Sequence, residues 1–394
     1  MIKHIKLNTV YYFFFLFIFL IIVSIITKGW LATWYALHIP SLLPPHFDLR
    51  FYQYPAFAIN EGRNPLFSLH EMWIANDAFG PASNFLGIPD YFLPAFKFAY
   101  FLNFHKELYF LGFAVFFIIS YVFCVYKILT IKKNSFWILI LFFSSSSLLV
   151  IERTNNDIII FCLLYWTAVF PNVLGIILNL LAVYVEFWPM AAGIAFIKKK
   201  IKILLLIFLS IFLIIFYKDM FGQNMKPVVS DYFSWGAKST SVSIKRHFGL
   251  EINYINILIF LFSLSLITLI NKLNLFKLQF GKQPSDLEER LFLMGSSLYV
   301  GLFILGSNVD YKLIFLIFCV PYLSRLKSKI SKYFIVISIV LASNWQLMSG
   351  NNYASLGALI NIMIKCLIFV ILLSLLIKYF INFYKNHGIK KIFF

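Results

Sequence analysis

Long apolar stretches with almost no charge constrain this chain more than any other feature of its sequence. Of its 394 residues, 61% are hydrophobic and only 13% are charged, and Phe alone occurs 48 times. A soluble globular domain has a lower apolar share and about twice this charge. The apolar residues run continuously and do not alternate, which excludes a lone outer-membrane β-barrel. The sequence therefore predicts an all-α fold, that of a polytopic integral membrane protein.

The cysteines and the N-terminus fit the same class. The cysteines lie inside apolar runs and lack CxxC spacing, so neither a disulfide framework nor a zinc site is expected. The first apolar run follows Lys3 and Lys6 and has no small-residue cleavage site, which predicts an uncleaved anchor with a cytoplasmic N-terminus. We expect the net charge of +18 to collect in cytoplasmic loops, and we expect no nucleic-acid partner.

Alternation of basic and apolar segments predicts a single transmembrane domain over residues 1–394 with about 10 to 12 transmembrane helices. Both termini then lie in the cytoplasm, and several spans are shorter than the ~20 residues of a full crossing. The expected spans are approximately 10–30, 107–128, 136–151, 157–171, 173–186, 203–217, 252–271, 291–306, 313–325, 333–348 and 355–382.

Two long loops are expected on the outer, periplasmic face. Residues 31–106 form the first outer loop, with interfacial helices such as one over residues 91–104, and residues 218–251 form the second. In this topology only Asp286, Glu288 and Glu289 lie inside, and the other carboxylates lie in or beside outer loops. Acidic residues contribute little to topology, so their placement indicates a working surface outside.

Away from their ends, the expected spans carry almost no charge. The exception is Lys365 in the last span, for which snorkelling is favoured over contact with a lipid phosphate. Transporters driven by ions or protons usually carry acids or histidines at mid-depth, and many are built from internal repeats. The expected spans have few such residues and no internal repeat is evident, so both features weigh against a transporter.

Short polar clusters at the outer ends of spans are the candidate site. They are Asp48 with Arg50, Glu152 to Asp157, Glu186, and Asp310 with Lys312. Interleaved acids and bases suit group transfer from a phosphate-bearing donor, because a carboxylate takes the proton of an acceptor hydroxyl while Arg or Lys stabilises the departing phosphate. Arg binds phosphate as a bidentate fork and Lys as a point charge.

Structural interpretations of the same residues stay open. Asp48 alternatively caps an interfacial helix or pairs with Arg50. Arg153 and Lys312 alternatively form salt bridges with Glu152 and Asp310. Asn155 and Asn156 at a helix start are more often caps than ligands.

Several of these motifs resemble one family. Asp48, Tyr52 and Tyr54, followed by Gly62, Asn64 and Pro65, resemble the first outer loop of the GT-C membrane glycosyltransferases, and among them glycosyltransferase family 87, the polyprenyl-phosphate-mannose-dependent type. Leu66 stands where that family has an aromatic residue. Glu152 to Asp157 and Asp310 to Phe315 are similar to further family elements, whereas Glu186 occupies a position where relatives often have Lys.

The resemblance implies a GT-C-like fold and an inverting hexosyltransferase with Asp48 as the general base. The enzyme would move a sugar from a polyprenyl-phosphate donor to a lipid, glycan or protein acceptor at the periplasmic face of a bacterial inner membrane. The expected substrate-binding residues are Arg50, Arg153, Asn155, Asp157, Glu186, Asp310 and Lys312.

No cofactor is expected, and the histidines lack the spacing of metal ligands. A divalent cation on the outer carboxylates has no support in the sequence but stays open. Two other functions also stay open. One is an O-antigen or polysaccharide polymerase or ligase, and the other is a transporter or flippase for lipid-linked saccharides.

Overall fold

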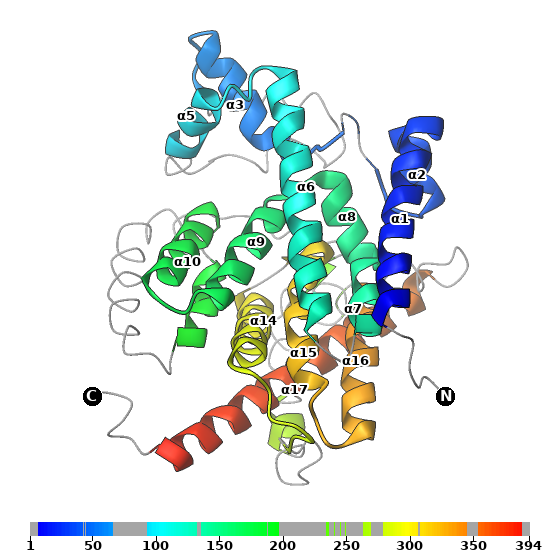
Figure 1. Ribbon diagram of the computed structural model, residues 1–394, viewed down its shortest axis with the longest axis vertical. Coiled ribbons are helices and arrows are strands. Elements are labelled where there is room, and N and C mark those ends of the chain that lie inside the picture. The colour runs from blue at the N-terminus through cyan, green and yellow to red at the C-terminus, as the bar shows by residue number, and fades with distance from the viewer. Residues whose placement is uncertain are drawn as a thin grey trace.

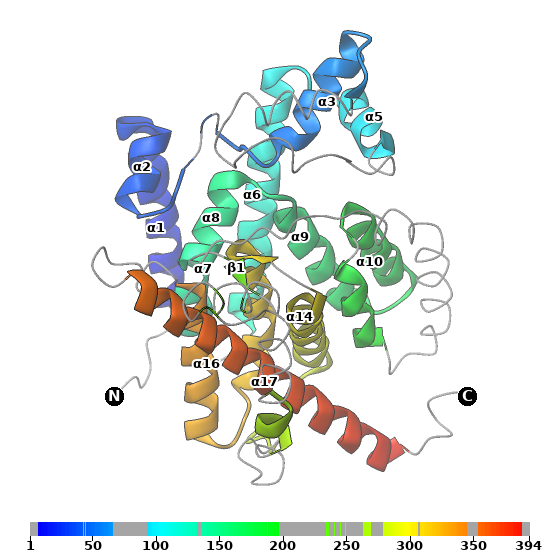
Figure 2. The same cartoon turned by 180° about the vertical axis from the view of Figure 1, so that it is seen from behind.

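The computed structural model of the chain is built almost wholly of helices (Figures 1 and 2). The structure describes residues 7–41, 43, 45–65, 93–131, 135–186, 188–196, 234–235, 240, 245, 249, 263–268, 279–305, 308–344 and 354–387. In these ranges, β1 (Ser234–Trp235) pairs antiparallel with β2 (Asn308–Val309), and an isolated bridge joins Phe280 to Leu326. The predicted all-α class is confirmed for this part of the chain.

Three helices in the described ranges are long and apolar enough to cross a bilayer. They are α1 (Leu7–Lys28), α6 (Glu107–Thr130) and α17 (Ala354–His387). Together, α7 (Ser135–Phe142) and α8 (Ser145–Arg153) are long enough for a fourth span, bent by 47°. Such helices are those of a membrane-embedded protein. The larger number of spans stays a prediction.

The bend between α7 and α8 lies in a run of buried serines, Ser144 to Ser147. The Ser144 hydroxyl caps α8 by accepting a hydrogen bond from the Ser147 amide at 3.4 Å. The Ser146 hydroxyl donates to the Ser343 carbonyl at 3.1 Å. Serine side chains compete for backbone hydrogen bonds inside a helix. The span expected over residues 136–151 is therefore broken at these serines, and α8 takes a direction of its own.

The central short helices follow the sequence prediction. α9 (Asn156–Val169) and α10 (Val173–Val185) match the expected segments 157–171 and 173–186. α16 (Lys329–Ser343) overlaps most of the expected segment 333–348 but begins and ends a few residues earlier.

Other elements differ from the expected segments. The segment 313–325 is a 3₁₀ helix, η4 (Asp310–Cys319), continued by α15 (Val320–Leu323), and a second 3₁₀ helix, η3 (Trp188–Phe196), follows α10. α14 (Asp286–Leu305) begins before the expected residue 291. Its first turn contains Asp286, Glu288 and Glu289, which precede the expected span, and the helix dipole favours negative charge there.

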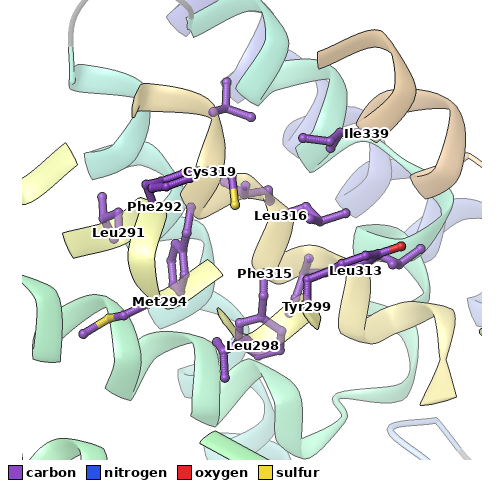
Figure 3. Packing of buried hydrophobic residues seen from close by; sticks show 14 of the residues in the cluster. Leu291, Phe292, Met294, Leu298, Tyr299, Leu313, Phe315, Leu316, Cys319 and Ile339 are labelled. Carbon is purple, nitrogen blue, oxygen red and sulfur yellow. The ribbon is translucent and has the colours of Figure 1, made fainter. Parts of the chain in front are cut away.

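The contact between α14 and η4 forms the centre of the core (Figure 3). A Cβ atom on Gly295 of α14 would lie 2.7 Å from the carbonyl oxygen of Phe315 in η4, so the two backbones touch. Nearby, the rings of Phe292 and Tyr322 stack with centroids 4.2 Å apart. This close packing fixes η4, which carries Lys312 in its first turn.

The first-loop helices are α2 (Trp30–Ala36), α3 (Arg50–Asn60) and α5 (Leu93–Phe101). α3 and α5 lie side by side at one end of the molecule, next to the beginning of α6 (Figures 1 and 2). Phe98 and Phe101 of α5 are largely exposed. Exposed aromatic residues are typical of a helix that lies in a membrane interface.

A turn follows α3, as the sequence predicts. Gly62 has a φ of +70°, a conformation that favours glycine. The side chains of Glu61 and Arg63 pair at 2.5 Å and are about half exposed, and such surface pairs contribute little to stability.

Some expected segments lie partly or wholly outside the described residues. The expected span 203–217 lies wholly outside the described residues. The expected span 252–271 is described only over residues 263–268, which are helical. Of the two outer loops, 31–106 is described apart from 42, 44 and 66–92, and 218–251 only at 234–235, 240, 245 and 249.

Candidate functional site

The segment that precedes α3 meets the corner between α8 and α9. α8 ends at Arg153, its C-cap Thr154 has a φ of 46° in the left-handed region, and Asn155 is the N-cap of α9. The Asp48 amide donates to the Arg153 carbonyl at 3.1 Å. The His46 Nδ1 and Thr154 Oγ1 atoms are 2.7 Å apart. These contacts hold the two segments together, so the side chains of Asp48, Arg153 and Asn155 converge.

Two residues of this corner face the Asp48 carboxylate, and one of them donates a hydrogen bond to it. Asn155 Nδ2 donates to Asp48 Oδ2 at 2.6 Å, and Arg153 Nη1 lies 3.8 Å from Asp48 Oδ1. The Asn155 Oδ1 atom accepts a hydrogen bond from the Asp157 amide at 2.9 Å. Asn155 is therefore a cap, as the structural interpretation expects, and it also orients Asp48. Support from a helix terminus of this kind gives a functional side chain a defined position.

The environment of Asp48 shifts the pKa of its carboxyl group. Burial raises the pKa of the Asp48 carboxyl group above its ordinary value, Arg153 and the Asn155 hydrogen bond act in the opposite direction, and the Glu186 charge raises it further. The side chain keeps 20% of its surface exposed, so a ligand can reach it. A carboxylate with a raised pKa is a better proton acceptor near neutral pH than an ordinary aspartate.

Lys312 lies between an indole ring and two carboxylates, and both carboxylates are close enough to Asp48 for their charges to interact with it. Its Nζ atom is 2.6 Å from Glu186 Oε2 and 4.0 Å from Asp157 Oδ1. It also lies 4.5 Å from the centre of the Trp188 ring, a cation–π distance. Trp188 Nε1 donates to the same Glu186 carboxylate. We call this group the Asp48 cluster; its members are Asp48, Glu152, Arg153, Asn155, Asp157, Glu186 and Lys312.

Asp157 is the member of the Asp48 cluster with unused hydrogen-bonding capacity. Its side chain is fully buried, and neither carboxylate oxygen has a hydrogen-bond partner among the described residues. Burial of a carboxylate without hydrogen bonds is costly. Such a group gains from any ligand hydroxyl that reaches it.

Arg50, an expected substrate-binding residue, faces α6 and lies outside the Asp48 cluster. Its Nη2 atom is 2.8 Å from Glu107 Oε1, and its guanidinium carbon lies 4.7 Å from the centre of the Phe110 ring. The alternative pairing of Arg50 with Asp48 is therefore wrong, because α6 supplies the carboxylate. Asp48 does not cap α3 either, since the N-cap is Leu49.

Asp310, another expected substrate-binding residue, also lies apart. It is fully buried, and its Oδ1 atom is 2.6 Å from Lys365 Nζ. Lys365 is only 1% exposed, so the expectation that it snorkels is wrong. The Tyr299 hydroxyl donates to the Lys365 carbonyl at 2.8 Å, in the region where α14 and α17 pack together. Lys312 pairs with Glu186 and not with Asp310.

Glu152 and Trp188 contribute to the site although no pattern in the sequence predicts how. Glu152 is fully buried and accepts hydrogen bonds from Trp30 Nε1 at 3.3 Å, Ser41 Oγ at 2.8 Å and Arg153 Nε at 2.7 Å. Trp30 and Ser41 are more than 100 residues away in the chain, so their contacts follow only from the tertiary structure. The available signal is that Glu152 begins the polar cluster Glu152 to Asp157 and that Trp188 lies two residues after Glu186.

Two further findings concern ligands and relatives. Across the described ranges, no group of three His, Cys, Asp or Glu side chains is arranged to hold a metal ion. Comparisons with family models, curated proteins and solved structures find no match to this chain. The resemblance to glycosyltransferase family 87 therefore stays a prediction from the sequence.

Proposed function

We propose that this chain is an integral membrane glycosyltransferase of the GT-C type. It transfers a sugar, a hexose, from a polyprenyl-phosphate-linked donor to a hydroxyl of a lipid, glycan or protein acceptor. The observation that carries the proposal is that Asp48 faces Arg153 and that Lys312 pairs with Glu186, a carboxylate whose charge acts on Asp48, although these residues come from distant segments of the chain. The resemblance of the first outer loop to glycosyltransferase family 87 supports the same activity.

Asp48 is the general base of the proposed reaction. Its carboxylate takes the proton of the acceptor hydroxyl as the acceptor oxygen attacks the anomeric carbon of the donor. The bond from that carbon to the phosphate oxygen breaks, its electron pair leaves with polyprenyl phosphate, and the anomeric centre inverts. The positive charges of Arg153 and Lys312 offset the charge that develops on the departing phosphate.

The charge balance of the Asp48 cluster favours a donor with one phosphate. The carboxylates of the cluster outnumber its cations, and both cations already have carboxylate partners, Glu152 at 2.7 Å from Arg153 and Glu186 at 2.6 Å from Lys312. A diphosphate brings more negative charge than a phosphodiester, and repulsion is strong in a partly buried site. This balance supports a monophosphate-linked donor over the alternative of a polymerase or ligase that uses diphosphate-linked glycans.

The proposed orientation places the Asp48 cluster at the periplasmic face of a bacterial inner membrane. Both termini then lie in the cytoplasm, and the chain crosses the membrane about 10 to 12 times. α3 and α5 lie in the outer interface, with exposed Phe98 and Phe101 against lipid. The bilayer is the partner that delivers the polyprenyl donor. A flippase would need a polar route through the spans, which carry little charge.

Transfer by the purified full-length protein in lipid nanodiscs tests the proposal. The probes are polyprenyl-phosphate hexoses, with a bacterial envelope extract as the source of acceptors. We expect polyprenyl phosphate and a new glycoside in equal amounts. Translocation of the lipid-linked sugar without a new glycosidic bond would overturn the proposal in favour of a flippase. Turnover of diphosphate-linked glycan alone would overturn it in favour of a polymerase or ligase.

The raised pKa of Asp48 predicts the acid side of the pH–activity profile. Asp48 accepts a proton only when it is ionised, so transfer slows as the pH falls through this pKa. Because burial raises the pKa, the acid limb of kcat/KM lies above the ordinary aspartate value of about 3.9. The profile of kcat/KM reports the free protein. An acid limb at or below the ordinary value would contradict a buried base.

A further inference from the structure

Arg153 lies between two carboxylates, the fully buried Glu152 and the partly exposed Asp48. Glu152 Oε2 is 2.7 Å from Arg153 Nε, and Arg153 Nη1 is 3.8 Å from Asp48 Oδ1. Arg153 Nη2 donates to the Pro40 carbonyl at 3.2 Å. The guanidinium thus makes its short contacts away from Asp48. The Nη1 atom faces Asp48 from beyond the usual hydrogen-bond distance of about 3.2 Å.

Glu152 is itself held in place. Its Oε1 atom accepts hydrogen bonds from the Trp30 indole and the Ser41 hydroxyl, which leaves Oε2 directed at Arg153. The side chain is fully buried. A buried carboxylate with fixed hydrogen bonds anchors its arginine in one geometry.

We propose that Glu152 is a positioning residue that keeps the Arg153 guanidinium out of direct hydrogen-bond contact with Asp48 and so keeps Asp48 able to accept a proton. The inference rests on the proposed function, in which Asp48 is the base. If Glu152 did not hold it, Arg153 would close on Asp48 as a direct ion pair. A direct arginine pair stabilises the carboxylate and makes it a weaker base.

The other groups that face Asp48 leave Arg153 as the cation whose position matters. Asn155 donates to Asp48 from the N-cap of α9. The negative charges nearby are those of Asp157 in α9 and Glu186 after α10. Lys312 of η4 pairs with Glu186 at 2.6 Å, and among the described residues no ion pair joins it to Asp48.

The test compares Glu152→Gln with the wild-type full-length protein in nanodiscs. Gln keeps an oxygen for Trp30 and Ser41 but removes the charge that holds Arg153. Infrared spectroscopy during a pH titration follows the Asp48 carboxyl band, which is assigned by its absence in Asp48→Asn. We expect the midpoint to move down by about one pH unit. The acid limb of kcat/KM should move with it, which a purely structural role would not cause.

A matched control is Glu107→Gln, because Glu107 also holds an arginine, Arg50, by a direct ion pair at 2.8 Å. Its Asp48 midpoint should stay at the wild-type value. In an Arg153→Met background, Glu152→Gln should cause a much smaller shift, since its effect passes through Arg153. If Glu152→Gln does not fold, Glu152→Asp provides a smaller shift in the same direction.

Two results would overturn the inference: an unchanged Asp48 midpoint in the Glu152 variants, or an equal shift in Glu107→Gln. The infrared titration needs no substrate, so it is independent of the proposed function. A shifted midpoint in a protein that transfers no sugar would overturn only the proposed function. Sugar transfer with an unshifted midpoint would overturn only the role of Glu152.

Discussion

Replacement of Asp48 with Asn is expected to slow sugar transfer by about 10²- to 10⁴-fold without loss of the fold. Asn has the same shape and keeps an oxygen for the Asn155 amide, which donates to Asp48 Oδ2 at 2.6 Å. Arg153 keeps its partner Glu152, so the change leaves no unpaired cation. What the variant loses is the ability to accept the proton of the acceptor hydroxyl. The effect should therefore fall on kcat and not on donor binding.

The measurement is kcat together with the Kd for a polyprenyl-phosphate hexose in the same nanodiscs, with thermal unfolding as the check of the fold. Glu61→Gln is the matched control, because Glu61 is an exposed acid of the same loop that pairs with Arg63. That variant should transfer sugar at the wild-type rate. A folded Asp48→Asn protein with wild-type kcat would show that Asp48 is not the base.

Replacement of Lys365 with Met is expected to destabilise the protein by about 3–5 kcal/mol. The Lys365 ammonium and the Asp310 carboxylate are 2.6 Å apart and almost completely buried. The second oxygen of Asp310 has no hydrogen-bond partner among the described residues, so Lys365 carries most of the compensation for this charge. Loss of the lysine would leave a carboxylate alone in the interior, where no water offsets its charge.

Thermal or denaturant unfolding in detergent micelles measures this loss. Lys385→Met is the control, because Lys385 is an exposed lysine of the same helix, α17, and its replacement should have little effect. The double variant Asp310→Leu/Lys365→Met should recover much of the stability, since an apolar pair can replace a buried ion pair at little cost. Equal losses in the single and double variants would contradict the interpretation of an unpaired charge.

Local features of the sequence predict much of this fold. The apolar runs that become α1, α6 and α17 have enough length and too little charge to be anything other than buried or lipid-facing helices. Asn155 caps α9, and Gly62 takes the left-handed conformation of a turn, because both preferences depend only on the residue and its nearest neighbours. The sequence also shows directly that Asp48 and the residues of the α8–α9 corner are polar groups in an otherwise apolar chain.

The partners of the charged residues could not be predicted in this way. The sequence placed Arg50 near Asp48 and Lys312 near Asp310, but the fold pairs them with Glu107 and Glu186. An ion pair depends on which helices lie side by side and on the direction of each side chain, and both follow from packing across the whole core.

The sequence by itself therefore determines that this chain is a helical membrane protein with polar groups at the ends of its helices. Hydrophobicity and capping can be read from it because both act over a few neighbouring residues. The bend at the buried serines, the burial of Lys365, the approach of Arg153 to Asp48 and the pairing of Lys312 with Glu186 required the tertiary structure. Each of these depends on contacts between segments far apart in the chain. Only close packing of the whole molecule brings those segments together.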